Sequence, residues 1–334
     1  MARKTLAVRG AGVVGLWQAL RLARRGHDVT LCERAAVPFS YGCSPFAGAM
    51  LAPNCERESA EAPIRDLGHR GLALWRETYP GTAADGTLVV ALNRDRGEID
   101  RFARMTEGYL QLSPAELAVY EPALTDRFAG ALFYAEEGHL SPEPALRFLL
   151  EQAEADGVKV RFGEGEYPAD VDFVVDCRGL AAKDALPNLR GVRGERIVVK
   201  SREVTFSRPV RLLHPRFPLY VVPWGHGTYM LGATVIESEE TGPVTLRSAL
   251  DLLSAAYALD PAFAEAEIVM QGAGARPAFP DNRPRIMPRG RYIYVNGLYR
   301  HGFLLAPVLA EMVAAFIETG ATDPEVFVAD PGER

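Results

Sequence analysis

The chain has 334 residues, enough for two domains or for one large α/β unit. Hydrophobic residues make up 48% and charged residues 24%, which is ordinary for a soluble globular protein. The net charge is −6, the pI is about 5.7 and no basic run is present, so nucleic acid is not an expected partner.

The chain opens with a strand, a glycine-rich turn, a helix and a second strand. A short apolar strand is expected at Leu6–Val8, and the turn follows as Gly10-Ala11-Gly12-Val13-Val14-Gly15. Apolar residues at helical spacing then run to Gly26, and a strand at Val29–Cys32 leads into Glu33. The first residues belong to the first strand and form no uninterrupted apolar segment, so we expect no signal peptide.

This opening unit has the order that an adenine dinucleotide site requires. Gly10 permits a tight turn, Gly12 lets a pyrophosphate approach the backbone, and Gly15 lets the helix pack closely on the strand. The N-terminus of the helix offers free N–H groups to the phosphates. Glu33 is placed to accept hydrogen bonds from ribose hydroxyls, and it would repel a 2′-phosphate. The alternative, a glycine-rich turn in an ordinary α/β domain, leaves Glu33 unexplained.

Beyond Glu33, a loop from Ala35 to Pro45 leads into a run of small residues, FAGAMLAP at 46–53. Small residues allow the backbone to approach a flat ligand closely. The start of an ordinary helix explains the same run equally well, so both interpretations stay open at this point.

The next part of the chain alternates helices and strands. We expect helices over 64–78, 99–110, 114–120 and 144–155, and strands over 87–92, 131–134, 158–162 and 171–175. Ser141 is the expected N-cap of the helix at 144–155. His139 has no partner nearby in the sequence, so we expect a structural role for it. The strand at 171–175 ends in Asp176-Cys177-Arg178-Gly179, where the chain either passes close to a ligand or makes a simple tight turn.

From Gly191 to Gln271 the pattern changes. We expect strands over 196–200, 203–207, 219–223, 228–234 and 264–271, with a helix over 245–256. The two strands at 219–223 and 228–234 form a hairpin across Trp224-Gly225-His226-Gly227. Strands that look antiparallel, after an α/β opening, predict a second domain that covers the substrate.

The C-terminal part returns to the first pattern. A strand at 292–295, the loop Asn296–Gly302 and a helix at 303–317 form a second strand–glycine–helix unit. Its helix N-terminus can point at the same cofactor, which suits a flavin because the reduced ring carries negative charge at its pyrimidine end. The apolar run LLAPVLAEMVAAFI is too short to span a membrane and contains Glu311, so we expect no membrane partner.

Side chains that could carry chemistry stand in loops rather than in an acid–base motif. The sequence has no apparent Ser-His-Asp order, paired-carboxylate motif or HExxH. What remains is Tyr220, Arg276 and Arg300. A guanidinium that points into a cleft suits a carboxylate, because its fork makes two parallel charge-assisted hydrogen bonds. Surface salt bridges are the alternative for each arginine, but two arginines in glycine-rich loops beside a cofactor motif favour a site.

Taken together, these motifs resemble the flavin-dependent D-amino-acid-oxidase family, and within it the glycine oxidases of thiamine biosynthesis. The resemblance covers nearly the whole chain. It rests on VRGAGVVGL, FAGAMLAPNCERE, GHLSPEPAL, VRGE at 192–195, YVVPWGHGTYMLGATV, GARPAFPDNRP and NGLYRHGFLLAP, in that order.

The resemblance implies an α/β fold of the D-amino-acid-oxidase type with a non-covalent FAD. A Rossmann-like FAD-binding domain would comprise 1–55, 139–195 and 272–334, and an interleaved α+β substrate domain with an antiparallel sheet would comprise 56–138 and 196–271. The implied cofactor-binding residues are Gly10, Gly12, Val13, Val14, Gly15, Glu33, Arg34, Cys43, Ser44, Gly48, Ala49, Met50, Glu166, Cys177, Gly179, Leu298, Tyr299, Arg300, His301, Gly302, Phe303 and Leu304.

The resemblance also implies where the substrate binds. Arg276 and Arg300 would hold its carboxylate with help from Tyr220, and Val235 and Ala49 would line the pocket. Four positions depart from the family pattern: Arg9 before the first glycine, Cys177-Arg178-Gly179 where Ala-Thr-Gly is common, Pro218, and Trp224 after Pro223. The last two stand near the pocket and leave the size of the substrate open.

The implied activity is oxidative deamination of glycine or a small amino acid, with molecular oxygen as acceptor and hydrogen peroxide as product. Three alternatives stay open: cleavage of an N-substituted glycine, an FAD dehydrogenase with another acceptor, and a non-catalytic FAD-binding protein. The four cysteines, Cys32, Cys43, Cys55 and Cys177, lack metal-ligand spacing. We therefore expect free thiols, no metal and a cytoplasmic location; the oligomeric state stays open, a homo-oligomer included.

Overall fold

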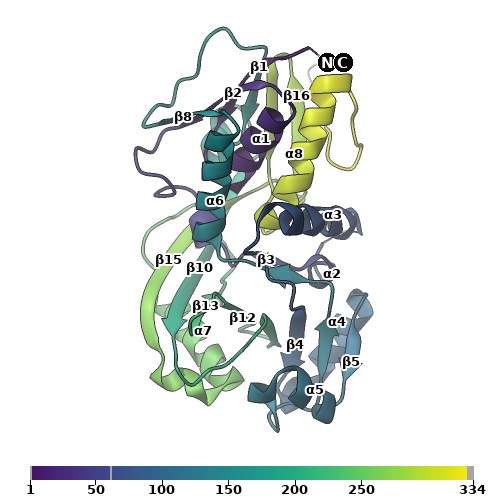
Figure 1. Cartoon of the computed structure of the whole chain (residues 1–334). Helices are drawn as coiled ribbons and strands as arrows, with labels where there is room; N and C mark the ends of the chain where they lie inside the picture. The colour runs from purple at the N-terminus through teal and green to yellow at the C-terminus, as the bar shows by residue number, and fades with distance from the viewer. Residues whose placement is uncertain (1, 61, 329–334) are drawn as a thin grey trace.

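A computed structural model describes residues 2–60 and 62–328 of the chain. Two β-sheets lie at opposite ends of an elongated molecule, and a group of short elements lies between them (Figure 1). The fold is the predicted one, a Rossmann-like unit joined to a unit built on a largely antiparallel sheet.

The first sheet has six strands in the order β16-β17-β9-β1-β2-β8. Five of them run parallel, and β16 is antiparallel to β17. The bounds are β1 Thr5–Arg9, β2 Asp28–Glu33, β8 Lys159–Phe162, β9 Phe173–Asp176, β16 Arg285–Arg289 and β17 Tyr292–Asn296. Helices α1 (Val13–Arg24), α6 (Pro142–Ala155) and α8 (Gly302–Thr319) pack on this unit, with α1 in contact with both others.

Helix α1 forms where the sequence predicts it. Gly12 is its N-cap, its apolar residues Leu16, Trp17 and Leu20 are buried, and Gly26 follows its end at a positive φ of 86°. Glycine adopts this conformation without a steric penalty, so the chain can turn back into β2.

Helix α8 is longer than the sequence pattern suggests. By length and composition alone it could cross a membrane, but 61% of it is buried inside the protein. It packs against α1 and against α3 (Ala62–Thr78), where Trp75 donates a hydrogen bond to the carbonyl of Phe303 at 2.6 Å. Burial in the core therefore accounts for its apolar character.

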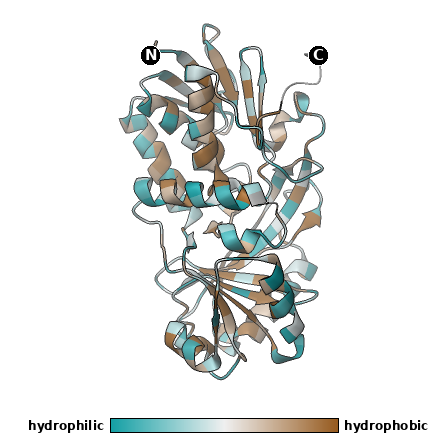
Figure 2. Ribbon diagram, turned by 90° about the vertical axis from the view of Figure 1, so that its right-hand side faces the viewer, coloured by the Kyte–Doolittle hydropathy of each residue, from teal (hydrophilic) through white to brown (hydrophobic). Residues whose placement is uncertain are grey.

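The second sheet contains nine strands in the order β14-β10-β13-β12-β11-β4-β6-β5, with β15 paired to β10. Apolar residues concentrate on its strands, and the helices around it carry polar outer faces (Figure 2). The bounds are β4 Thr87–Ala91, β5 Leu110–Leu112, β6 Ala131–Tyr134, β10 Arg190–Lys200, β11 Val210–Leu213, β12 Leu219–Pro223, β13 Thr228–Gly232, β14 Ile236–Glu237 and β15 Glu267–Ala278. The helices are α4 Arg96–Met105, α5 Pro114–Tyr120 and α7 Leu246–Leu259.

Short elements connect the two units. A two-stranded sheet pairs β3 (Met50–Leu51) with β7 (Gly138–His139), and α2 (Pro53–Glu56) follows β3 directly. The 3-10 turns are η1 Ser44–Phe46, η2 Asn93–Asp95, η3 Pro122–Leu124, η4 Gly179–Asp184 and η5 Pro261–Glu265. The long strands β10 and β15 run across the expected domain boundaries at 195/196 and 271/272, and the division into domains stays a prediction.

The strands expected at 196–200 and 264–271 are the longer β10 and β15, and two further expected elements differ from the structure. The helix expected over 99–110 ends at Met105, because Thr106 adopts an extended conformation and its hydroxyl donates to the carbonyl of Phe102. The strand expected over 203–207 is absent, because the Ser201 hydroxyl accepts hydrogen bonds from the N–H groups of Glu203 and Val204 and holds a turn.

Candidate active site

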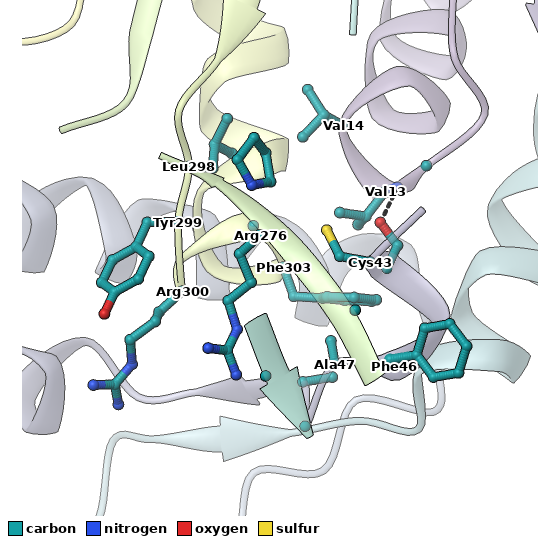
Figure 3. A pocket seen from close by; sticks show the side chains of 18 of the residues that line it. Val13, Val14, Cys43, Phe46, Ala47, Arg276, Leu298, Tyr299, Arg300 and Phe303 are labelled. Carbon is teal, nitrogen blue, oxygen red and sulfur yellow. Dashed lines mark hydrogen bonds between the residues drawn. The ribbon is translucent and has the colours of Figure 1, made fainter. Parts of the chain in front are cut away.

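The glycine-rich turn and Glu33 lie together at the N-terminus of α1. The N–H of Val13 donates to the Ser44 hydroxyl at 3.1 Å (Figure 3). The Glu33 carboxylate accepts from the N–H of Ala11 at 2.8 Å and of Ala35 at 3.0 Å. Glu33, Gly12 and Ser44 also line one small cavity, so the acidic end of β2 faces the helix N-terminus as the motif requires.

The first turn packs against the end of β9. Gly10 has a φ of 95°, and a Cβ there would lie 2.8 Å from the carbonyl oxygen of Cys177. A Cβ at Gly15 would collide with the Gly10 carbonyl. Cys177 and Gly179 both line the larger cavity next to this turn, so the ends of β1 and β9 form one edge of the site.

The larger cavity is lined by segments from both ends of the chain (Figure 3). Its first wall is the N-terminus of α1, and its second is the C-terminal loop that precedes α8. The predicted cofactor-binding residues that line it are Gly12, Val13, Val14, Cys43, Ser44, Gly48, Ala49, Met50, Cys177, Gly179, Leu298, Tyr299, Arg300, Gly302 and Phe303.

This cavity fits FAD. At one end the α1 N-terminus can hold the pyrophosphate, and Gly12 adds no side chain there, where a Cβ would make a tight 3.1 Å contact with the Ser44 hydroxyl. In the middle, Ala47, Gly48 and Ala49 offer the flat backbone surface that an isoalloxazine needs. At the other end stands the N-terminus of α8, where Gly302 lines the cavity.

The remaining predicted cofactor residues do not line these cavities in the part of the chain described. Arg34 is exposed and stacks on Tyr41 at 4.6 Å, and Glu166 is exposed in the loop after β8. His301 is buried as the N-cap of α8, and Leu304 is buried against α3. Their contacts with the cofactor stay predictions.

The three candidate side chains for chemistry come together at one end of the cavity. Arg276 lies on β15, Tyr220 on β12 and Arg300 in the loop before α8, and all three line both the large cavity and a second cavity beside it. Arg276 and Arg300 extend in the same direction (Figure 3). Pro218 and Val235 line the second cavity, whereas Trp224 stacks on Arg196 at 4.9 Å.

In the described part of the chain, Arg276 makes its hydrogen bond to the backbone. Its Nη1 donates to the carbonyl of Thr234 at 3.2 Å, and its guanidinium lies directly on Gly194 of the neighbouring strand β10, where any Cβ would collide with it. Sequence analysis assigned no role to Gly194, which stood only as a letter in the VRGE run. Its lack of a side chain leaves the space that the guanidinium occupies.

Two further charged residues at this end were missed by sequence analysis, Glu56 on α2 and Arg211 on β11. Glu56 lies 3.5 Å from Arg300 and 3.9 Å from Arg211. Burial alone would raise the pKa of Glu56, but Arg300 and the cations near it outweigh burial and lower the pKa. Glu56 in turn raises the pKa of Arg300. Only the fold brings α2 next to the C-terminal loop, so no local pattern identifies this pair.

A dinucleotide cradle, a flat surface between two helix N-termini and an arginine over the far end together define a flavin-dependent oxidoreductase. The family described as DAO, FAD dependent oxidoreductase, matches residues 5–316, and the chain belongs to this family. The resemblance found in the sequence, the fold class and the FAD cofactor are thereby confirmed.

Relatives of known name cover almost the whole chain. A Rhizobium etli protein proposed to be the thiamine biosynthesis oxidoreductase ThiO is 51% identical over 322 residues, 96% of this chain and 98% of its own length. The glycine oxidase of Geobacillus kaustophilus is 27% identical over 362 residues, 96% of this chain and 94% of its own. The crystal structure of iminodiacetate oxidase from Chelativorans sp. BNC1 superposes with a TM-score of 0.81 over 96% of both chains at 21% identity, which shows a shared fold.

Glu33 offers a direct test of the nucleotide end. Replacing it with alanine removes the proposed ribose acceptor and two loop hydrogen bonds. We expect the Kd for FAD to rise about 10- to 100-fold, since a hydrogen bond to a charged group contributes about 1.5–3 kcal/mol. Titrating the apoprotein with FAD and following flavin fluorescence measures this. Glu164→Ala, at an exposed acid nearby, is the control; equal Kd values for both variants would refute the role of Glu33.

Proposed function

We propose that this protein oxidises glycine to the imine, which water converts to glyoxylate and ammonia, with oxygen as final acceptor and hydrogen peroxide as product. The observation that carries the proposal is Arg276, a guanidinium that faces the cofactor cavity and has a backbone carbonyl as its partner. The two relatives named above, a glycine oxidase and a thiamine biosynthesis oxidoreductase, support the same activity and place it in thiamine biosynthesis.

The residues present explain how glycine would be held. The fork of Arg276 binds the carboxylate through two parallel hydrogen bonds and fixes the direction of the Cα–H bonds. FAD, when bound, supplies the acceptor for the two electrons and the hydrogen of that bond. Gly48 lies against Tyr220, where a Cβ would approach the ring to 2.7 Å, so a side chain at this position would displace Tyr220.

If the hydrogen leaves carbon as hydride, no base is needed to remove a proton. The carboxylate in the cavity lining fits this mechanism, because it is a poor base. Glu56 is the carboxylate that lines the cofactor cavity among the residues described. Its lowered pKa and its contacts with Arg300 and Arg211 make it a poor proton acceptor. The residues at this end of the site therefore orient the substrate and interact with its charge.

An N-substituted glycine is a second candidate, and one observation favours it. The second cavity opens beyond Tyr220, Arg276 and Arg300 and is lined by Pro218 and Val235. A substituent on the substrate nitrogen can extend into this space. Cleavage of such a substrate would give glyoxylate and a primary amine.

The decisive experiment is a spectrum of the FAD-loaded protein without oxygen. We expect glycine to bleach the flavin absorbance, and admission of air to restore it with formation of peroxide. Acetate, which has a carboxylate but no amine, is the control and leaves the flavin oxidised. A flavin that glycine does not bleach would remove the proposal, and a bleached flavin that air fails to re-oxidise would make the protein a dehydrogenase.

A further inference from the structure

The charges around the substrate end are nearly balanced. The residues that line the two cavities include four guanidiniums, of Arg101, Arg211, Arg276 and Arg300. They also include three carboxylates, of Glu56, Glu58 and Glu98. The described part of both linings therefore carries one positive charge in excess.

Three of the four guanidiniums already have carboxylate partners. Arg101 lies 2.7 Å from Glu58 and 3.0 Å from Glu98. Arg211 lies 3.3 Å from Glu58 and 3.9 Å from Glu56.

Arg300 lies 3.5 Å from Glu56, and its side chain is 25% exposed. Arg276 differs from these three, because its partner is the Thr234 carbonyl. The excess charge therefore resides on Arg276.

His301 does not alter this balance. Its Nδ1 lies 3.4 Å from a Glu56 oxygen, which would form a second ion pair if the imidazole were protonated. Burial lowers the pKa of His301 below its ordinary value, more than Glu56 raises it, so the ring is neutral near pH 7. Glu56 remains ionised because the cations around it lower its pKa. Its negative charge is thus available to Arg300.

We infer that Glu56 is a specificity-determining residue, which neutralises Arg300 and so restricts the site to substrates with one carboxylate. The inference rests on the proposed function and narrows its substrate class. Glycine and N-alkyl glycines present one carboxylate to Arg276. A second carboxylate, as in iminodiacetate, would enter the second cavity and meet guanidiniums already paired with Glu56, Glu58 and Glu98. Leaving water without a free cation is costly for such a group, so it is rejected.

The inference distinguishes two kinds of N-substituted glycine, which sequence analysis treated as one class of substrate. Neutral substituents fit the second cavity beside Pro218 and Val235, and N-carboxymethyl substituents do not. The expectation that Arg276 and Arg300 hold the substrate carboxylate stays a prediction, and the inference assigns the larger share to Arg276 because Arg300 lies 3.5 Å from Glu56.

The test is to remove the charge of Glu56 and keep its shape. With Glu56→Gln, the ratio of kcat/KM for iminodiacetate to kcat/KM for glycine should rise at least tenfold, because Arg300 becomes free to receive the second carboxylate. Glu56→Asp keeps the charge and should keep the wild-type ratio within about threefold. Glu77→Gln, at an exposed position of α3 that lines neither cavity, is the matched control and should keep the wild-type ratio.

A binding measurement tests the preference for one carboxylate over two without any turnover. Isothermal titration of the FAD-loaded protein with acetate and with diglycolate, which has two carboxylates and no amine, gives two Kd values. We expect the wild-type protein to bind diglycolate no more tightly than acetate, and Glu56→Gln to bind it at least tenfold more tightly than acetate. A wild-type protein that prefers diglycolate tenfold would overturn the inference, even if Glu56→Gln does not fold.

An unchanged ratio of Kd values in a folded Glu56→Gln would overturn it too. These outcomes differ from failure of the proposed function, which is a flavin that glycine does not bleach in the wild-type protein. The two Kd values can be measured whether or not glycine bleaches the flavin.

Discussion

Replacement of Arg276 by alanine is expected to lower kcat/KM for glycine by about 10²- to 10⁴-fold, which corresponds to roughly 3–5 kcal/mol for a buried charged partner. The wild-type guanidinium lies in the space above Gly194 and has no competing carboxylate among its described contacts. Without it, the substrate carboxylate enters a cavity whose remaining cations are paired with Glu56, Glu58 or Glu98. Steady-state peroxide formation at several glycine concentrations measures the change.

The control for Arg276→Ala is Arg247→Ala, which removes an exposed arginine from α7. Arg276→Lys should lie between the two, because an ammonium keeps the charge but loses the planar fork. The flavin content of all three variants should match the wild type, since Arg276 stands at the substrate end of the cavity. A kcat/KM for Arg276→Ala within threefold of wild type would rule out this residue as the carboxylate receptor.

The second large effect concerns stability. Glu137 is fully buried, and its Oε1 accepts the N–H of Cys55 at 2.7 Å. Burial raises its pKa from an ordinary 4.5 to about 7. The folded state therefore holds the proton more tightly than the unfolded state, so the stabilisation is complete below about pH 4.5 and is lost as the pH rises through 7. The full loss is about 3 kcal/mol.

Glu137→Gln should remove this dependence, because an amide keeps the acceptor for Cys55 and does not titrate. We expect the free energy of unfolding of the wild type to fall, relative to Glu137→Gln, by up to about 3 kcal/mol between pH 5 and pH 8. Urea unfolding at several pH values measures both. Glu136→Gln changes the exposed neighbour and should follow the wild type at every pH. Parallel curves for Glu137→Gln and wild type would show that Glu137 does not titrate in this range.

Local signals predicted some elements to the residue. Helix α5 spans 114–120 as expected, because Ser113 and Glu116 form a capping box and Pro114 occupies its first position. Strands β6 and β12 also have the expected bounds, since a turn residue or a proline stands at their ends. The opening unit was predictable for the same reason, as its glycines and Glu33 act within one short stretch.

The long strands β10 and β15 were not predictable in full, because the sequence places glycines inside them. In an isolated strand a glycine favours a break. Here each one accommodates a neighbour from elsewhere in the chain: Arg276 lies on Gly194, Phe46 on Gly272 and Cys43 on Gly274. The first contact requires β10 and β15 to pair, and the other two require the loop at 43–46 to pack on the sheet, so no window of sequence contains them.

The candidate site also contains a part that could be predicted from the sequence and a part that could not. Tyr220, Arg276 and Arg300 were identified from their residue types, and the family resemblance gave them roles. The structure brings them together, but Tyr220 and Arg276 stand in strands rather than in the expected loops. The partnership of Glu56 with Arg300 could not follow from spacing, since 244 positions separate the two residues in the sequence and the pairing requires α2 and the C-terminal loop to meet. The sequence therefore shows that Arg300 is charged, but it does not show that Glu56 neutralises this charge.

The ladder between β10 and β15 has a mechanical consequence. It runs from Arg190 opposite Ala278 to Lys200 opposite Glu267, and beyond its upper end the N–H of Tyr299 donates to the carbonyl of Pro277 at 2.9 Å. Because both strands belong to the second sheet, this pairing fixes Arg276 of β15 over Gly194 of β10. The position of this guanidinium is therefore set by backbone pairing within the sheet rather than by a loop.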